Sequence, residues 1–231
     1  MAEITFLGHA CFLIEEGDTR LLIDPFLTGN PKAAREAGDV DPTHILLTHG
    51  HADHIGDTVD VAKRTGAPVV AIVELANEIS GDLGEDHQVF DPNIGGTVKF
   101  DWGWVKLTPA WHTAVSPKGT PHMPAGLLIN VGGKTIYHLG DTALFSDLSL
   151  VARRGDPVDV ALMCIGGHYT MDRYDAVTAV ELIQPRSVIP CHYGTFPPIE
   201  TDAQAFKADV EQRTGGKTTV ELLDPGGTFS L

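Results

Sequence analysis

The hydrophobic and polar positions along the first half of this chain predict strands that alternate with amphipathic helices. A hairpin is indicated by the Glu16-Gly17-Asp18 turn between two apolar runs. A helix is indicated after residue 54, because Ile55, Val59 and Ala62 recur with helical spacing. The expected strands lie at residues 4–7, 11–15, 20–24, 44–48 and 69–72, and the expected helices at 55–65 and 74–83.

The second half repeats this alternation. Strands are expected within residues 97–111, and Gly132-Gly133 marks the turn of another hairpin. Two loops rich in glycine and proline are expected at 26–40, with one helical turn, and at 114–125. The later strands are expected at 158–163 and 187–191, the helices at 174–183 and 203–213, and two further strands close the chain.

The two halves resemble each other. The hairpins at 12–24 and 127–141 both end in an aspartate, Asp24 or Asp141. Each is followed by an apolar strand that leads through a loop containing glycine and histidine into an amphipathic helix. Two such halves packed sheet to sheet, with helices outside, predict an α/β (α+β) protein, a four-layer αββα sandwich in one domain spanning 1–231. The alternative is a chance likeness of two short hairpins.

Composition narrows the possible partners. The chain has 231 residues and a formal net charge of −15, which argues against a duplex nucleic-acid binder. No apolar run approaches the ~18 residues of a membrane span, and no leader peptide is recognised. Cys11, Cys164 and Cys191 each lie in an apolar run, so we expect buried free thiols in a cytoplasmic protein.

The segment from Thr48 to His54 carries the densest chemistry. Its four potential metal ligands are His49, His51, Asp53 and His54, and they follow an apolar strand and precede a helix. Imidazole and carboxylate groups are good ligands for zinc, manganese, iron or nickel. Side chains at such a strand-to-helix turn can converge on one point. The alternative is a set of surface histidines at the start of a helix.

This H-x-H-x-D-H segment resembles the signature of the metallo-β-lactamase superfamily. The remaining parts of that family's pattern occur in order, each at the end of an apolar strand: Asp24, His112, Asp141 and His192. The resemblance spans nearly the whole chain. It implies the αββα fold and two divalent metal ions, most readily zinc, with manganese, iron or nickel as alternatives.

The resemblance also implies a role for each ligand. One metal would be held by His49, His51 and His112, and the second by Asp53, His54 and His192. Asp141 would bridge the two metals with its carboxylate. A hydroxide shared by both ions would attack the substrate, and Asp53 would orient it as a catalytic residue.

Four further residues are expected near this centre. Asp24 would orient a ligating imidazole, or else form a turn before Pro25. His9 and His168 would line the pocket as substrate contacts or proton donors, or else pack as structural histidines. Tyr193 would donate a hydrogen bond to a developing oxyanion, or else pack in the core or at the rim. The loop holding His122 is expected to cover the cleft.

Two other segments narrow the branch of the superfamily. The residues at 6–12 and 191–196 look like those of small metal-dependent hydrolases similar to ascorbate-6-phosphate lactonase. We therefore expect hydrolysis of a small, anionic phosphodiester, lactone or ester, with no membrane partner and a possible homo-oligomer. The alternatives are a single-strand RNA or DNA nuclease and a non-hydrolytic metal-binding or redox protein.

Overall fold

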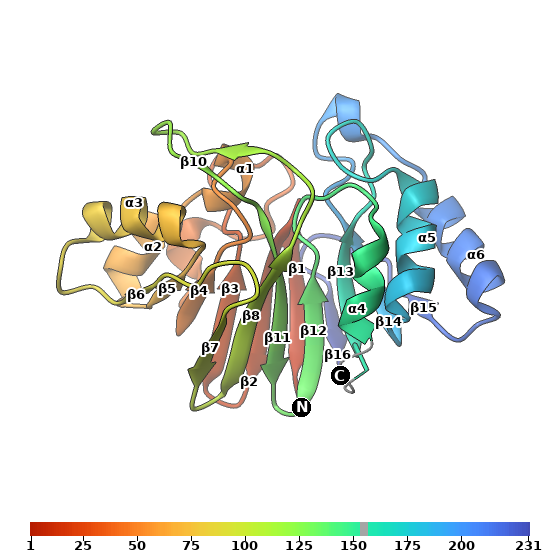
Figure 1. The fold of residues 1–231 in the computed structure, drawn as a ribbon, viewed down its shortest axis with the longest axis horizontal. Helices are drawn as coiled ribbons and strands as arrows, with labels where there is room; N and C mark the ends of the chain where they lie inside the picture. The colour runs from red at the N-terminus through yellow and green to blue at the C-terminus, as the bar shows by residue number, and fades with distance from the viewer. Residues whose placement is uncertain (153–156) are drawn as a thin grey trace.

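A computed structural model describes residues 1–152 and 157–231 of the chain (Figure 1). Within these ranges the strands form two seven-stranded sheets and a separate two-stranded hairpin. The first sheet contains, in spatial order, β16 (Thr228–Ser230), β1 (Glu3–Gly8), β2 (Cys11–Glu16), β3 (Thr19–Ile23), β4 (His44–Leu46), β5 (Val69–Val70) and β6 (Val89–Phe90).

The second sheet is built on the same plan from the later part of the chain. It contains, in spatial order, β15 (Thr219–Val220), β14 (Ser187–Cys191), β13 (Val160–Cys164), β12 (Lys134–His138), β11 (Ala125–Val131), β8 (Gly103–Pro109) and β7 (Thr97–Phe100). The helices are α1 (Ala52–Ile55), α2 (Thr58–Thr65), α3 (Val73–Leu83), α4 (Ser149–Ala152), α5 (Arg173–Ile183) and α6 (Ala203–Thr214), with short 3₁₀ turns η1 (Ala37–Asp39), η2 (Ser146–Leu148) and η3 (Pro197–Ile199).

Both faces of the second sheet are buried, because apolar side chains point to both sides of its strands. On β11, Leu127 and Ile129 belong to the central core that the two sheets share, whereas Leu128 belongs to an outer core beneath the helices. This alternation follows from the two-residue period of a strand. The outer core includes Val180 of α5 and Phe206 of α6, so two hydrophobic layers hold the second sheet in place.

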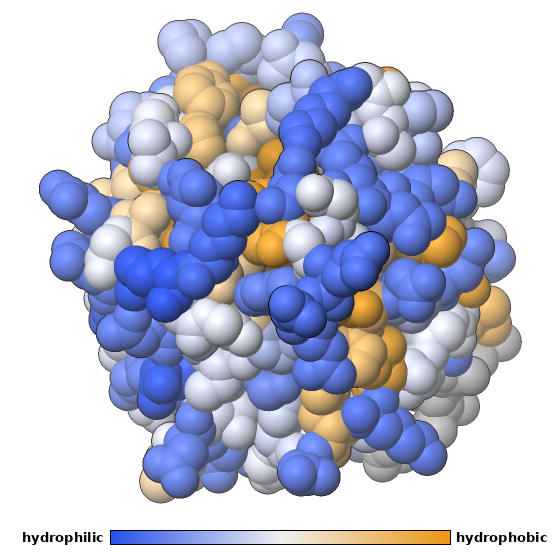
Figure 2. All heavy atoms as spheres, turned by 90° about the vertical axis from the view of Figure 1, so that its left-hand side faces the viewer, coloured by the Kyte–Doolittle hydropathy of each residue, from blue (hydrophilic) through white to orange (hydrophobic). Residues whose placement is uncertain are grey.

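The helices form the two outer layers. Figure 1 shows α2 and α3 beside the first sheet, and α4, α5 and α6 beside the second. Asp172 caps α5 by accepting from the backbone N–H groups of Tyr174 and Asp175, and Asp202 caps α6 by accepting from the backbone N–H of Ala205. The face that carries α2 and α3 is mostly hydrophilic (Figure 2). The predicted αββα sandwich is therefore confirmed.

The expected repeat is present in the strand pairing. The strands β1, β2, β3 and β4 follow one another with antiparallel, antiparallel and parallel pairing. The strands β8, β11, β12 and β13 follow one another with the same three pairings. The two halves therefore share one topology, and the prediction from the hairpins at 12–24 and 127–141 holds.

Some predicted elements differ in extent. The helix expected at 55–65 is two helices, because Gly56 has a φ of 37° and a Cβ atom there would collide with the backbone of Pro25. The loop expected at 114–125 contains a small hairpin of β9 (Ala114–Val115) and β10 (Pro121–His122). The strand β6 and the segment of η2 and α4 had not been expected. In the described ranges, none of the helices is both long and apolar enough to cross a membrane.

Candidate metal centre

The candidate ligands lie at one edge of the two sheets. His49 and His51 follow β4, Asp53 and His54 lie on α1, and the other three follow the second-sheet strands β8, β12 and β14. Strands with the same direction end at the same edge of a sheet. The fold therefore brings together ligands that are distant in sequence, and this edge lies at the top of Figure 1, near α1.

Among the described residues, three groups of side chains have ligand atoms close enough to hold a metal ion. Within each group, all these atoms lie within 4.8 Å of one another. The groups are His49 with His51 and His112; His9 with Asp53, His54 and His192; and His49 with His54 and Asp141. The first two groups contain the two predicted ligand sets, and His9 joins the second.

Asp141 lies between these two sets. Its Oδ2 is 3.9 Å from Nε2 of His49 and 3.7 Å from Nε2 of His112. The carboxylate also faces the second set, with Oδ2 3.1 Å from Nε2 of His192 and Oδ1 3.4 Å from Nε2 of His54. One carboxylate in contact with imidazoles of both sets has the position that a bridging ligand needs.

The residues fit a bound metal, because several buried polar atoms face one another without a hydrogen bond. Among the described residues, Nε2 of His54, Nε2 of His192 and Oδ1 of Asp141 make no hydrogen bond. Buried polar atoms are rarely left unpaired, since the loss of hydration costs about 1–3 kcal/mol each. A divalent cation between these atoms would satisfy all three.

Asp24 connects ligands of both sets. Its Oδ2 accepts hydrogen bonds from Nδ1 of His54 at 2.8 Å and from Oγ1 of Thr48 at 2.6 Å. Oγ1 of Thr48 is in turn 3.0 Å from Nδ1 of His49. Both imidazoles therefore present Nε2 to the centre, as a ligating histidine fixed through its other nitrogen does.

His9 lies in the centre itself. Its Nε2 is 3.1 Å from Oδ2 of Asp53, and its Nδ1 is 2.9 Å from Oγ1 of Thr195. The backbone of His9 has a φ of 59°, which turns the chain sharply between β1 and β2. Sequence reasoning did not find Thr195, because its contact with His9 joins positions 186 residues apart.

The other predicted contacts are less central. Tyr193 is half-buried and lines a cavity beside His9. His168 is exposed, packs edge-on against Tyr169 and belongs to none of the metal-binding groups found in the described residues. The structure thus does not bring His168 into the cluster, and a pocket role for it stays a prediction.

His122 fixes the loop that carries the ligands. Its Nε2 accepts a hydrogen bond from the backbone N–H of Gly50 at 2.8 Å, and its Nδ1 donates to the carbonyl of Thr120 at 3.0 Å. The hairpin of β9 and β10 is also tied to α3, where Ser116 donates to Glu78. The segment expected to cover the cleft therefore packs against the ligand loop.

Burial and charge set the protonation of the cluster. Burial lowers the pKa of His49 well below its usual value, which favours the neutral form that binds metal. Burial would raise the pKa of Asp141, but the adjacent His192 and His54 outweigh it and lower that pKa. The same carboxylate, together with Asp24, raises the pKa of His54 against the opposing effect of burial. The centre therefore pairs anionic carboxylates with imidazoles.

The cluster has a buried floor and an accessible rim. His49, His54, Asp141 and His192 are buried, whereas His51, Asp53 and His112 are half-buried. A cavity of about 160 Å³ lies beside the floor and is lined by His9, Lys32, Tyr193, Thr195 and Asp224 among others. A substrate can thus reach the ligand atoms from one side.

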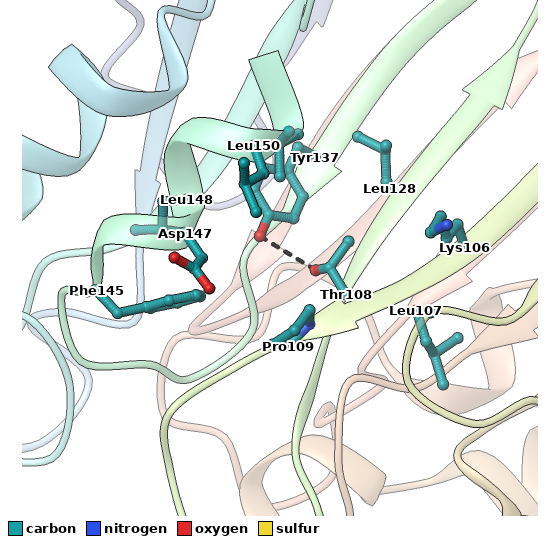
Figure 3. Close-up of a pocket in the computed structure, with 12 residues that line it drawn as sticks. Lys106, Leu107, Thr108, Pro109, Leu128, Tyr137, Phe145, Asp147, Leu148 and Leu150 are labelled. Atoms are coloured by element: carbon teal, nitrogen blue, oxygen red, sulfur yellow. Dashed lines mark hydrogen bonds between the residues drawn. The ribbon is translucent and has the colours of Figure 1, made fainter. Parts of the chain in front are cut away.

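A second cavity is separate from this centre. It has a volume of about 180 Å³ and lies between the second sheet and the segment of η2 and α4 (Figure 3). Its lining is mainly apolar, and Oγ1 of Thr108 and the hydroxyl of Tyr137 are 3.1 Å apart at one wall. None of the candidate ligands lines it, so it lies outside the metal centre.

Comparison with known proteins assigns the chain to one family. The family described as "Beta-lactamase superfamily domain" matches residues 3–192. The chain belongs to this family. The matched span includes every predicted metal ligand.

Full-length relatives and a solved structure agree with this assignment. The chain is 45% identical over 231 residues to a "UPF0173 metal-dependent hydrolase" of Thermococcus kodakarensis, with 100% of both chains covered. A relative of the same name from Thermus thermophilus is 48% identical over 209 residues, which cover 89% of this chain and 90% of the relative. The structure of Igni18, "a novel metallo hydrolase" from Ignicoccus hospitalis, matches with a TM-score of 0.88 and 35% identity, covering 100% of this chain and 99% of that chain.

These relatives agree on a metal-dependent hydrolase of the metallo-β-lactamase superfamily. The recognition made from the H-x-H-x-D-H segment is therefore confirmed at the level of the superfamily. The narrower similarity to ascorbate-6-phosphate lactonase stays a prediction.

Proposed function

We propose that this protein is a hydrolase with a dinuclear metal centre that cleaves small anionic phosphodiesters, lactones or esters. One observation carries the proposal. Five imidazoles and two carboxylates from both halves of the fold converge at one edge, and the Asp141 carboxylate lies between the two ligand sets. Such a set suits zinc, manganese, iron and nickel.

We assign further parts of the proposed reaction to the residues around the ligands. Two divalent ions bound there would supply an activated water nucleophile and positive charge for the substrate's oxygen atoms. Asp53 is half-buried at the rim, beside His9, so its carboxylate would accept a hydrogen bond from that water. The half-buried rings of His51 and His112 leave room for substrate on this side.

An anionic substrate fits the charges near the centre. The cavity beside His9 is lined by Lys32, whose ammonium group makes no ion pair with the described residues. Asp224 lines the same cavity and would disfavour a large negative charge there. A small substrate with one anionic group therefore fits better than a polyanion such as RNA, which the net charge of −15 also disfavours.

The test combines metal analysis with a substrate panel. Protein purified without chelator and reloaded with zinc or manganese should bind two equivalents of metal. It should then hydrolyse at least one of bis(p-nitrophenyl) phosphate, a lactone that carries a phosphate group or a p-nitrophenyl ester that carries a carboxylate. Asp53→Ala should lower kcat on that substrate by more than about 100-fold. The matched control is Asp60→Ala, which removes an exposed carboxylate from α2 and should leave kcat unchanged.

Three results would contradict the proposal. One is a stoichiometry that stays at one metal after reloading. Another is activity of Asp53→Ala within about tenfold of wild type, which corresponds to only ~1.4 kcal/mol in the barrier. The third is an absence of hydrolysis across the panel with cleavage of single-stranded RNA instead, which would favour the nuclease alternative.

A further inference from the structure

We infer that His9 is itself a ligand of the second metal, so that this metal is held by His9, Asp53, His54 and His192. The inference rests on the proposed dinuclear centre and deepens it. The ligand atoms of these four residues lie within 4.8 Å of one another. This role differs from the proton-donor role predicted for His9 from the sequence.

The distances around His9 are those of a ligand. Nε2 of His9 and Oδ2 of Asp53 are 3.1 Å apart, as are Nε2 of His49 and Nδ1 of His51 in the other set. Two atoms that each bind one zinc ion at about 2.0–2.2 Å in a tetrahedral arrangement are separated by roughly 3.4 Å. Both pairs are therefore spaced to share one ion.

The remote nitrogen of His9 is also held as in a ligating histidine. Nδ1 of His9 bonds to Oγ1 of Thr195, just as Nδ1 of His54 bonds to Asp24. Such a bond orients the ring and directs Nε2 toward the position of the metal. Thr195 and His9 are both buried, with exposed fractions of 8% and 1%, so the bond is protected from water.

The internal repeat supplies an independent argument. His9 follows β1, and His112 follows β8, and these two strands occupy the same place in the two halves of the fold. His112 belongs to the first ligand set and His9 to the second group. Each half thus contributes one histidine from the end of its corresponding strand.

This assignment makes the two metal positions unequal. The first ion would have three protein imidazoles and the shared Asp141, with an open side at the half-buried His51 and His112. The second would have four protein ligands besides Asp141, one more than the first. Fewer positions for water and substrate would remain at the second ion, so exchange should take place chiefly at the first.

The test replaces His9 with asparagine in the cobalt-loaded protein. Asparagine tolerates the positive φ at this position, but its short side chain lacks the imidazole. His168→Asn is the matched control, because His168 also has a positive φ, of 56°, and lies outside the groups. Thr195→Val removes only the hydroxyl that holds the ring.

Two measurements on these proteins decide the assignment. In the His9→Asn variant, one of the two cobalt dissociation constants should rise by more than about 100-fold over wild type, beyond the 10–100-fold range of an orienting residue. Proton NMR at saturating cobalt should lose one paramagnetically shifted, exchangeable imidazole N–H signal. Thr195→Val should raise the same cobalt dissociation constant by about 10-fold and keep the shifted imidazole signal of His9. His168→Asn should have the cobalt affinities and the signals of wild type.

The outcomes separate the inference from the proposed function. If wild type binds fewer than two cobalt ions, the dinuclear proposal fails. If wild type binds two and the His9→Asn variant keeps every shifted imidazole signal, His9 is not a ligand, whatever the change in affinity. In that case His9 acts only by holding the carboxylate of Asp53.

Discussion

At the scale of single residues, Asp24 controls the orientation of ligands in both sets. Its carboxylate is fully buried and accepts from the imidazole of His54 and the hydroxyl of Thr48. The hydroxyl of Thr48 reaches the imidazole of His49. One carboxylate therefore orients two imidazoles that belong to different candidate ligand sets.

We expect Asp24→Asn to weaken the binding of both metals. An amide has one acceptor oxygen, so it cannot keep all three of the hydrogen bonds made to this carboxylate without a mismatch. The loss in affinity should be about 10–100-fold for each metal, measured by competition with a chromogenic chelator.

The control for this substitution is Asp159→Asn. Asp159 is also a nearly buried carboxylate, and it accepts from the backbone N–H of Thr135 and pairs with Arg186, far from the ligands in the fold. Its metal affinities should equal those of wild type. Equal affinities in the Asp24 variant would show that the ligands orient themselves without it.

The sequence identified most residues of the centre but not their connections. The ligands could be found because histidines and aspartates stand at the ends of apolar strands, in a family-like order. Thr48 and Thr195 carry no such signal, since hydroxyl residues are common and their partners are fixed only by folding. The position of His168 was inferred from the repeat alone, which places backbone segments and not side chains.

At the scale of elements, the ligand loop is enclosed between α3 and the hairpin of β9 and β10. Gly50 lies against both. A Cβ atom there would be 2.8 Å from Cδ1 of Leu75 and 2.9 Å from Cε1 of His122. Because Gly50 has no side chain, the hairpin can approach closely enough for Nε2 of His122 to accept the N–H of Gly50.

We expect Gly50→Ala to destabilise the metal-free protein by about 1–3 kcal/mol, the usual cost of overpacking. The measurement is the urea midpoint in the presence of chelator. Gly38→Ala is the control, because a Cβ at that glycine would meet nothing within 4 Å. Equal midpoints for the two variants would show that His122 and Leu75 move aside freely.

The hydrophobic pattern predicted these elements better than their ends. The helix expected at 55–65 is divided because Gly56 packs against the backbone of Pro25, a contact that depends on tertiary structure. Asp53 and His54 are therefore on a separate short helix, α1, before that glycine. The β9–β10 hairpin was missed because it has only two residues in each strand.

At the scale of the whole molecule, all three cysteines are buried free thiols, with Cys11 and Cys191 in the central core shared by the two sheets and Cys164 in the outer core beneath the helices. Burial raises the pKa of the thiols of Cys11 and Cys191, and that of Cys164 to about 12. Burial also raises the pKa of Tyr137 to about 12. The sequence predicted the buried thiols, because each lies in an apolar strand.

These groups should make the protein lose stability in alkali. Above the ordinary thiol pKa of 9.0, the unfolded chain has lost protons that the folded chain keeps. The unfolded state then binds fewer protons, so the free energy of unfolding falls as the pH rises. Each thiol contributes about 1.4 kcal/mol per pH unit until its folded pKa is reached, and nothing below pH 9.

The measurement is the free energy of unfolding in urea, with chelator and reductant present, at intervals from pH 8 to pH 11. The free energy of unfolding of the wild-type protein should be constant near pH 8 and should fall steeply above pH 9. In the Cys164→Ala variant, the free energy of unfolding should fall less steeply with pH. Its slope should be smaller than that of wild type by about 1.4 kcal/mol per pH unit once the thiol of the unfolded wild-type chain is ionised. Val188→Ala, which truncates the same outer core without removing a titratable group, should be less stable but have the wild-type slope. If Cys164→Ala and Val188→Ala have the same slope, the Cys164 thiol ionises as readily in the folded protein as in the unfolded chain, and the core around it admits the charge.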